Sequence, residues 1–249
     1  MTKADFAALH RADAPLVLFN IWDAASAQAV AKAGAKAMAT GSAGLAGAQG
    51  FDDGEAIPFA ALLETVRQIA GVISGLPFTV DMESGFADGL DEIANNAAAL
   101  IDAGAIGCNL EDRLIVQGGL RDLEEQAERI AAVGEAGLFV NARTDTFLGP
   151  LMIGDNPNSA EFVDAAIVRA KAYHEAGAGC VFAPGLSDPD LIQHLCAAVS
   201  IPINIMRLPG MVSNAELAGL GVARISYGPG PWRDAMASVE AAAAEAFGL

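Results

Sequence analysis

Short apolar runs alternate with longer amphipathic stretches along the whole chain. Two of these stretches, residues 58–73 and 160–177, carry apolar residues at a spacing of three to four and are predicted to be helices. Pro58 is expected in the first turn of its helix. The apolar runs are four or five residues long, which predicts buried strands. Eight such runs are present: residues 16–20, 36–40, 78–82, 106–110, 138–142, 180–184, 203–206 and 223–226.

The same junction between helix and strand occurs four times. In residues 31–40, 101–110, 174–183 and 218–227 a helical pattern ends, a glycine suited to a left-handed C-cap follows, and an apolar run begins. Helices joined to strands in this way are typical of parallel sheets. Eight strands in 249 residues, with no Pro-, Ser- or Gly-rich linker, predict a single domain over residues 1–249, an α/β fold of the (β/α)8 TIM-barrel type.

An open, doubly wound parallel sheet is the alternative architecture. Such sheets usually carry a Gly-rich phosphate loop after the first strand, and the segment NIWDAASAQAV has none. The barrel is therefore the preferred prediction.

Composition narrows the range of functions. Hydrophobic residues make up 53% of the chain and charged residues 18%, as in compact α/β proteins. No apolar run reaches the roughly 18 residues of a membrane helix, and the first residues lack the apolar region of a signal peptide, so a cytoplasmic location is expected. With 31 acidic and 14 basic residues the net charge is −17, which argues against nucleic-acid and anionic-membrane partners.

Cysteine and histidine offer little support for a zinc or nucleophile site. The three cysteines are scattered and are expected to be buried small hydrophobes. The three histidines fall in helical segments far from any acidic cluster and are expected to be ordinary surface residues.

Acidic residues gather at the predicted carboxyl ends of the second to fifth strands, the end of a barrel at which active sites lie. Charges of one sign at a common mouth require a cation, and oxygen ligands without nearby His or Cys favour Mg²⁺ or Mn²⁺. Acids after strands also serve as helix caps, which is the better interpretation of Asp88 and Asp91. For Asp81 or Glu111 taken alone, capping and metal binding are equally expected.

Arg143 changes this balance. It ends an apolar strand in a chain that has few basic residues, where an unpaired guanidinium is costly. A bidentate donor that faces a metal can bind the carboxylate of a substrate, so that the substrate is held by the metal at one end and by the arginine at the other.

Four segments together resemble the isocitrate lyase/phosphoenolpyruvate mutase superfamily. They are NIWDAASAQAVAKAGAKAMATGSAGLAGAQGFDDGE, VDMESGF, GCNLED and VNARTDTFL, each at a predicted strand end and in the order of the family. The resemblance implies a (β/α)8 barrel and a homo-oligomer, a dimer or tetramer, in which the eighth helix is commonly exchanged between subunits. Residues 230–247 would be that helix, although an ordinary terminal amphipathic helix would look the same.

The resemblance also implies a metal site. Asp81 would bind Mg²⁺ directly, and water molecules would connect the ion to Asp53, Glu83 and Glu111. Mn²⁺ is the other ion considered.

For the substrate, the resemblance implies a small carboxylic acid held at the metal by Asp81 and at a carboxylate by Arg143. Backbone donors around Ser42, Ala43 and Gly44 would hold a carboxylate or enolate oxygen. Asp53, Ser42 and Arg143 are the residues expected to take part in catalysis.

Departures from the family indicate the reaction. Isocitrate and methylisocitrate lyases carry a Lys-Lys-Cys-Gly-His loop after the fourth strand, and here EDRLIVQGGLRDLEEQAERI has no Cys, His or Lys. The Lys and Asn of the carbon–phosphorus enzymes are also missing from this segment, and Thr40 stands where the mutase has a Trp. A metal-chelated enolate formed without a loop acid best fits decarboxylation of oxaloacetate or a similar 2-oxo dicarboxylate.

Several alternatives stay open at this point. A carbon–carbon lyase acting on a substituted malate would need a base, for which Tyr227 is a candidate. A carbon–phosphorus mutase or hydrolase is disfavoured, and a non-catalytic metabolite-binding relative is also considered. A phosphate-binding barrel enzyme would use the Gly-containing segment SYGPGPW before the last helix.

Overall fold

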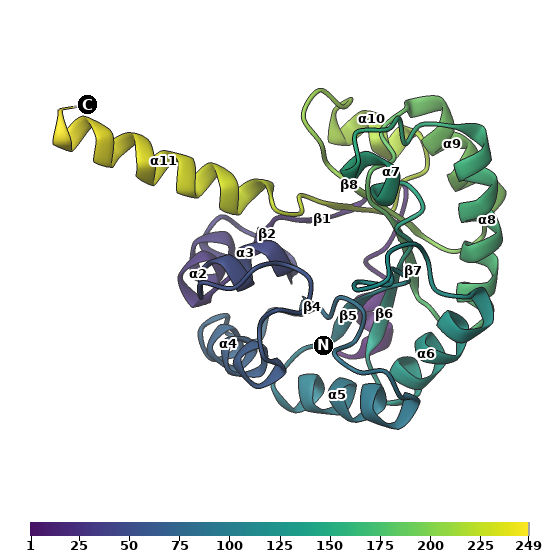
Figure 1. The fold of residues 1–249 in the computed structure, drawn as a ribbon, viewed down its shortest axis with the longest axis horizontal. Helices are drawn as coiled ribbons and strands as arrows, with labels where there is room; N and C mark the ends of the chain where they lie inside the picture. The colour runs from purple at the N-terminus through teal and green to yellow at the C-terminus, as the bar shows by residue number, and fades with distance from the viewer. Residues whose placement is uncertain (249) are drawn as a thin grey trace.

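Nine short parallel strands form one sheet that closes into a ring in the computed structural model, which describes residues 1–248 (Figure 1). The order is β1-β9-β8-β7-β6-β5-β4-β3-β2, and all neighbours are parallel. The strands are β1 (Leu16–Leu18), β2 (Asn20–Ile21), β3 (Met38–Thr40), β4 (Phe78–Asp81), β5 (Gly107–Glu111), β6 (Phe139–Arg143), β7 (Cys180–Ala183), β8 (Ile203–Met206) and β9 (Arg224–Ser226).

The first barrel strand is split, which explains why nine strands replace the eight expected. β1 pairs with β9 and β2 pairs with β3, so the two halves close the ring from its two sides. Phe19 separates the halves. The predicted (β/α)8 barrel is confirmed, and each predicted strand overlaps an observed one.

Helices surround the ring. They are α1 (Lys3–Ala7), α2 (Ala24–Lys32), α3 (Ser42–Gly47), α4 (Phe59–Val72), α5 (Leu90–Asp102), α6 (Leu123–Glu135), α7 (Leu148–Met152), α8 (Ala160–Glu175), α9 (Pro189–Ala198), α10 (Asn214–Gly219) and α11 (Gly230–Phe247). The helices predicted over 58–73 and 160–177 correspond to α4 and α8. Pro58 is the N-cap of α4 and not part of its first turn, because its ψ of 136° is extended.

The repeated junctions have the predicted backbone. Gly34, Gly104, Gly177 and Gly221 follow α2, α5, α8 and α10 with φ between 94° and 108°. This left-handed conformation is costly for residues with a Cβ, so glycine ends the helix and turns the chain into the next strand. Of the two acids expected to serve α5, Asp91 lies in its first turn, whereas Gly89 is the N-cap.

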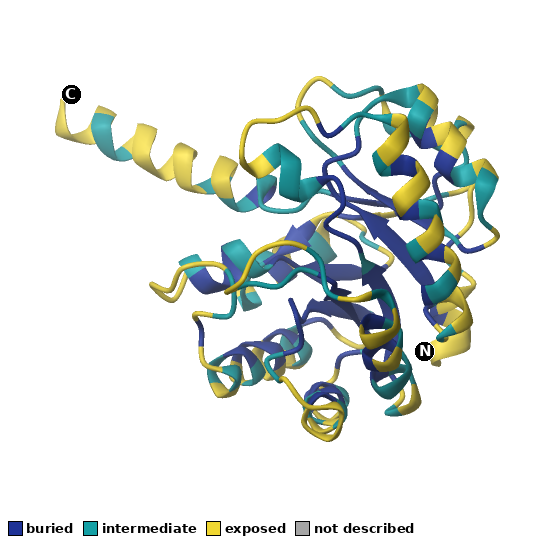
Figure 2. Cartoon of the chain, turned by 45° about the vertical axis from the view of Figure 1, so that its right-hand side comes forward, coloured by how far each residue is buried: buried dark blue, intermediate teal, exposed yellow. Residues whose placement is uncertain are grey.

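Most buried apolar residues belong to one cluster, and Figure 2 shows that buried residues are concentrated in the strands and on parts of the surrounding helices. A smaller cluster fills the amino end of the barrel, where Phe6 of α1 meets Phe139 edge-on at 5.1 Å between ring centroids. His10 stacks on Phe139 at 4.6 Å and is buried, so the expectation of a surface histidine was wrong there. Burial lowers the pKa of His10 to about 3, so this ring is a neutral packing element. Cys108 and Cys180 are buried, as expected.

The last helix is the exception to the compact arrangement. Figure 1 shows α11 extending away from the barrel, with most of its length exposed in Figure 2. None of the helices in residues 1–248 combines the length and the apolar character that a membrane crossing requires.

Candidate active site

A cavity of about 200 Å³ opens at the carboxyl ends of the barrel strands. It is lined by five of the eight residues that the sequence points to: Ser42, Ala43, Asp53, Asp81 and Arg143. Larger grooves of about 730 and 460 Å³ lie on the outer wall and near the amino end of the barrel, away from these polar residues. The smaller cavity is therefore the site at which chemistry is best supported.

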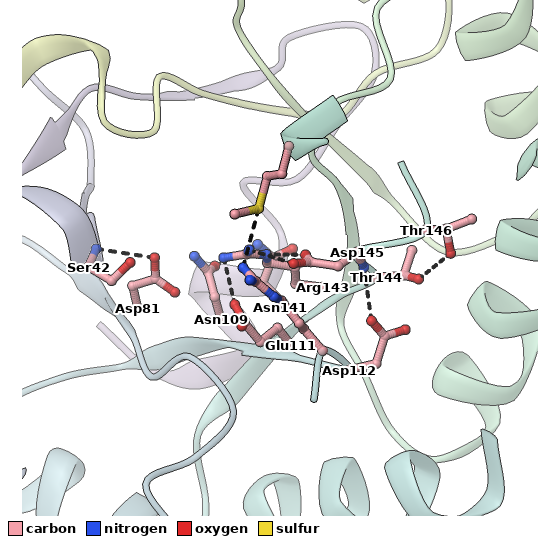
Figure 3. Close-up of polar contacts among 12 residues, drawn as sticks. Ser42, Asp81, Asn109, Glu111, Asp112, Asn141, Arg143, Thr144, Asp145 and Thr146 are labelled. Atoms are coloured by element: carbon pink, nitrogen blue, oxygen red, sulfur yellow. Dashed lines mark hydrogen bonds and ion pairs between the residues drawn. The ribbon is translucent and has the colours of Figure 1, made fainter. Parts of the chain in front are cut away.

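Asp81 ends β4 at the wall of this cavity. Its backbone amide donates to Thr40 Oγ1 at 2.9 Å, and the Ser42 amide donates to Asp81 Oδ2 at 3.3 Å (Figure 3). The other carboxylate oxygen, Oδ1, is buried without a partner among the described residues. Burial raises the pKa of Asp81, the charge of Arg143 opposes this, and Asp53 adds to it. A buried carboxylate oxygen that lacks a donor is suited to a hard cation.

Glu83 lies two residues further, in a strained turn. Its φ is 49°, and Glu55 and Phe86 also have positive φ values of 59° and 53°. The Glu55 amide donates to Glu83 Oε2 at 2.9 Å, while the Glu55 carboxylate accepts from Ser84 Oγ and the Phe86 amide. Residues held in sparsely populated conformations often cluster at functional sites. The loop that carries Asp53 is thus fastened to the loop that carries Glu83.

Burial raises the pKa of Glu83 to about 8, with further contributions from the negative charges of Asp81 and Asp53. Such a shift reflects chiefly the loss of hydration on burial, to which the nearby negative charges add. The same cause raises the pKa of Glu111, where burial is again the largest effect.

Arg143 is held by two protein carboxylates. Its Nη1 lies 2.7 Å from Glu111 Oε2, and its Nε and Nη2 donate to the two oxygens of Asp145 at 2.6 and 2.9 Å (Figure 3). Burial alone would lower the pKa of Arg143, but Asp145 and Glu111 raise it well above its ordinary value. In the sequence, the only indication of this ion pair is that Arg143 and Asp145 lie two residues apart at the end of a predicted strand.

Asp112 faces the helix layer and not the cavity. It accepts hydrogen bonds from the Asp145 amide at 2.9 Å, the Tyr173 hydroxyl at 2.7 Å and Arg169 Nη1 at 3.1 Å. This network ties the end of β6 to α8 and so fixes the position of Asp145. Of the two acids that end the fourth predicted strand, only Glu111 faces Arg143.

The spacing of the carboxylates around the cavity fits a hard divalent cation that has a single direct protein ligand. No three His, Cys, Asp or Glu side chains in residues 1–248 lie close enough together to ligate one ion directly. Asp81 as the single direct protein ligand, with water between the ion and Asp53, Glu83 and Glu111, is compatible with that spacing. Asp81 Oδ1 is the orphaned atom that such an ion would satisfy.

Gly44 and Tyr227, which the sequence analysis considered as site residues, both make contacts within the protein. A Cβ on Gly44 would lie 3.0 Å from Trp232 and 3.2 Å from Trp22, so glycine permits close packing of α3 there. The Tyr227 hydroxyl accepts from Asn214 Nδ2 at 3.0 Å and does not line the cavity.

The SYGPGPW segment also has an internal partner. The amides of residues 227 and 228 both donate to Asn20 Oδ1 at 2.9 Å. These donors are occupied, which weighs against a phosphate site at this position.

The segment that follows β5 is a tight turn. Arg113 and Leu120 form an antiparallel bridge, and Gly118 and Gly119 have φ values of 74° and 79°. Ile115 in this turn lies near Gly54, so the turn covers the Asp53 loop without contributing a Cys, His or Lys.

Asn109, Arg224 and Arg233 also line the cavity, and no sequence pattern selects them. Asn109 and Arg224 lie within strands, and Arg233 lies in the first turn of α11. Only the closed ring shows that they share one cavity with Asp81.

The metal-free protein is expected to lose stability as the pH rises from about 5 to 8. Glu83 has a pKa of about 8 when folded, against an ordinary value of 4.5. In this range the folded chain keeps a proton that the unfolded chain has lost, so stability falls with rising pH. One pKa unit is about 1.4 kcal/mol, and each kcal/mol corresponds to roughly 2–4 °C for a chain of this size.

Thermal melts in EDTA at several pH values measure this effect. Glu83→Gln removes the titrating carboxyl and is expected to flatten the dependence. A wild-type Tm that stays constant or rises up to pH 8 would contradict the prediction.

Comparison with known proteins places these features in a family. Residues 6–247 match the phosphoenolpyruvate phosphomutase family model. A crystal structure from Burkholderia cenocepacia J2315, provisionally described as a phosphonomutase, is 46% identical, covers 97% of this chain and 98% of its own, and has a TM-score of 0.91. At the level of the fold, a phosphonopyruvate hydrolase complex with oxalate and Mg²⁺ has a TM-score of 0.85 at 23% identity, covering 100% of this chain and 88% of its own.

Curated relatives include two lyases. The 2-methylisocitrate lyase of Escherichia coli K12 is 31% identical over 209 residues, which are 81% of this chain and 68% of the relative. The oxaloacetate decarboxylase of Rhodopseudomonas palustris HaA2 is 28% identical over 178 residues, which are 71% of this chain and 60% of that enzyme.

Proposed function

The chain belongs to the phosphoenolpyruvate phosphomutase family, within the isocitrate lyase/phosphoenolpyruvate mutase superfamily, and on that premise we propose that it is a Mg²⁺-dependent lyase of small 2-oxo acids. The reaction proposed is decarboxylation of oxaloacetate or a close 2-oxo dicarboxylate through an enolate. The similarity to an oxaloacetate decarboxylase supports this substrate class.

One observation carries the proposal. Among the described residues, Asp81 has a buried, unpartnered oxygen beside the buried carboxyl group of Glu83, and the turn after β5 carries no Cys, His or Lys. Decarboxylation needs negative charge to be stabilised on a carbonyl oxygen, but the departing CO₂ needs no proton. A cation held at Asp81 would meet the first requirement, and the turn after β5 contributes no Cys, His or Lys that could act as an acid.

The residues have separate roles in this proposal. Asp81 would hold Mg²⁺, and Asp53, Glu83 and Glu111 would hold the water molecules around it. When bound, the ion supplies a Lewis acid for the developing oxyanion. The Ser42 amide donates to Asp81 in the ligand-free chain, and the amides of Ser42, Ala43 and Gly44 would bind a carboxylate or enolate oxygen. Arg143 would hold Glu111 in position through their ion pair.

The first test follows pyruvate formation from oxaloacetate with Mg²⁺, against Mg²⁺ alone and an EDTA control. Turnover above the metal-only rate that EDTA abolishes supports the proposal. Absence of turnover on oxaloacetate, together with cleavage of a substituted malate, would replace the decarboxylase with a carbon–carbon lyase, which the similarity to 2-methylisocitrate lyase favours as the second candidate. Silence on both classes would favour a metabolite-binding protein.

We also propose that the protein is a homo-oligomer in which α11 packs against a second copy. The groove of about 730 Å³ on the outer wall of β1 is lined by apolar residues that include Val17 and Phe19, which are 41% and 44% exposed. α11 projects away from the barrel and exposes Met236 and Val239 at helical spacing (Figure 1). An exposed helix and an uncovered apolar wall of the same chain can bury each other's surface in a symmetric dimer.

The double variant Met236→Glu/Val239→Glu is expected to convert the oligomer to monomer, because burying two carboxylates against the groove is costly. Size-exclusion chromatography with light scattering measures the mass. Glu245→Gln on the same helix is the matched control and is expected to keep the wild-type mass. A wild-type protein that is monomeric at micromolar concentration would refute this proposal.

A further inference from the structure

Arg129 and Arg224 are fully buried and Arg143 is 11% exposed, and these three arginines differ in how their charge is satisfied. Arg129 donates to three backbone carbonyl groups of residues 84–88 at 2.6 to 2.9 Å. Arg143 is bound by two carboxylates. Arg224 has no carboxylate within 4 Å among residues 1–248. Arg143 therefore has a partner for every guanidinium nitrogen and Arg129 for both of its terminal nitrogens, whereas Arg224 lacks a partner at Nε and at Nη1 within the described chain.

Arg224 starts on β9 and reaches the opposite wall of the ring. Its Nη2 lies 3.3 Å from Thr79 Oγ1 on β4 and 3.4 Å from Asn109 Oδ1 on β5, both beyond the usual N–H···O range. Its Nε and Nη1 are buried and have no hydrogen-bond partner in the described chain. The side chain is 0% exposed. Most of its donors are thus withdrawn from water without compensation.

The charge of Arg224 persists despite this burial. Burial lowers the pKa of Arg224 to about 10, which leaves the side chain protonated at neutral pH. An unpaired buried cation reduces the stability of a fold. Proteins keep such costly groups where function requires them.

The position of Arg224 indicates that function. It lines the same cavity as Asp81, Ser42 and Arg143, and its partner Asn109 lines that cavity too. Each guanidinium nitrogen of Arg143 already contacts Glu111 or Asp145. Arg224 is therefore the buried cation of this cavity, within residues 1–248, that retains free donors.

We infer that Arg224 binds an anionic oxygen of the ligand that occupies this cavity. The inference rests on the proposed function for the class of ligand, a small 2-oxo acid, and assigns a substrate contact outside the residues that the family resemblance implies. The oxygen can come from two sources: a carboxylate of the ground-state ligand, or the enolate oxygen that forms during the reaction. Both are oxyanions, for which a guanidinium with unused donors is well matched.

Binding of oxalate, a planar dianion that resembles an enolate with its carboxylate, tests the inference by calorimetry with and without Mg²⁺. Arg224→Met is expected to weaken oxalate binding about tenfold or more, because a charge-assisted contact is lost. Arg224→Lys, which keeps the charge on a shorter side chain, is expected to retain part of the affinity.

Stability separates this role from a structural one. Because Arg224→Met removes an unpaired buried charge, the Tm of the ligand-free variant is expected to equal or exceed that of the wild type. Arg129→Met is the comparison variant: it removes a buried arginine whose two terminal nitrogens donate to three backbone carbonyl groups, and it is expected to lower Tm. A loss of Tm in Arg224→Met comparable to that of Arg129→Met, with unchanged oxalate binding, would overturn the inference.

Pyruvate as a second probe distinguishes the two sources of the oxyanion. Weaker binding of both pyruvate and oxalate in Arg224→Met identifies a carboxylate contact. Weaker binding of oxalate alone identifies the position of the enolate oxygen. Unchanged binding of both, or no binding of either by the wild type, refutes the inference. Because binding is measured without turnover, failure of the decarboxylation assay leaves this test intact.

Discussion

Replacing Asp81 with alanine is expected to reduce Mg²⁺-dependent decarboxylation of oxaloacetate by at least about 1,000-fold. Removing one contact to a developing oxyanion typically costs about 100- to 1,000-fold, and Asp81 is the one carboxylate in the cavity with a buried, unpartnered oxygen in residues 1–248. Loss of the direct ligand would remove both the metal and the charge stabilisation that it supplies. Initial rates of pyruvate formation, measured over a range of Mg²⁺ concentrations, give the effect.

Asp88→Ala is the matched control for this substitution. Asp88 lies on the same loop, is exposed and does not line the cavity, so its variant is expected to keep wild-type activity. A second readout is the rise in Tm on adding Mg²⁺, which Asp81→Ala should lose because binding to the folded state is the source of that rise. An Asp81→Ala protein with wild-type turnover and an unchanged Mg²⁺ response would refute the proposed metal role.

Replacing Arg143 with methionine is expected to be the most destabilising single change in the site. Its guanidinium neutralises Glu111 and Asp145, whose side chains are 5% and 1% exposed. Removing one partner of a buried ion pair commonly costs about 3–5 kcal/mol because the remaining charge stays uncompensated. For a chain of this size that corresponds to a Tm lower by roughly 10 °C.

A double-mutant cycle shows whether the uncompensated carboxylate causes this loss. Adding Glu111→Gln to Arg143→Met removes one of the two stranded charges and is expected to recover part of the Tm. Equal Tm values for the single and double variants would contradict the explanation. Arg143→Lys retains the charge but loses the two-point contact with Asp145, so an intermediate Tm is expected.

The burial of several carboxylates around the cavity explains both the expected loss of activity in Asp81→Ala and the expected loss of stability in Arg143→Met. Asp81, Glu83 and Glu111 have raised pKa values, chiefly because they are buried, and Arg143 offsets only part of their mutual repulsion. The ligand-free site is therefore electrostatically unsatisfied. A divalent cation would reduce that repulsion and increase stability on binding.

Much of the fold can be predicted from the sequence because its signals are local. Strand length, helical spacing and the glycines at residues 34, 104, 177 and 221 each act over a few neighbouring residues. The carboxyl end of each strand is equally local information, and a barrel brings these ends to one rim whatever the loops do. Asp81, Asp53 and Arg143 could be assigned to one site for this reason.

The split of the first strand at Phe19 and the burial of His10 were not predictable in this way. Both depend on which surfaces meet when the ring closes: Phe19 lies between a half-strand that pairs with β9 and one that pairs with β3, and His10 stacks on Phe139. Contacts between residues more than a hundred positions apart leave no periodic signal in the sequence.

The sequence by itself determined the barrel and the rim on which its acids gather, since alternation, turn chemistry and strand ends are properties of short segments. The tertiary structure decided which partner each charge has. Arg143 forms ion pairs with Glu111 and Asp145, and Asp112 contacts the helix layer. Within residues 1–248, Arg224 has no carboxylate partner and has unpaired guanidinium nitrogens. The physical reason is that a buried charge is stabilised by whatever lies within a few ångströms of it, and that neighbourhood exists only once the ring has closed.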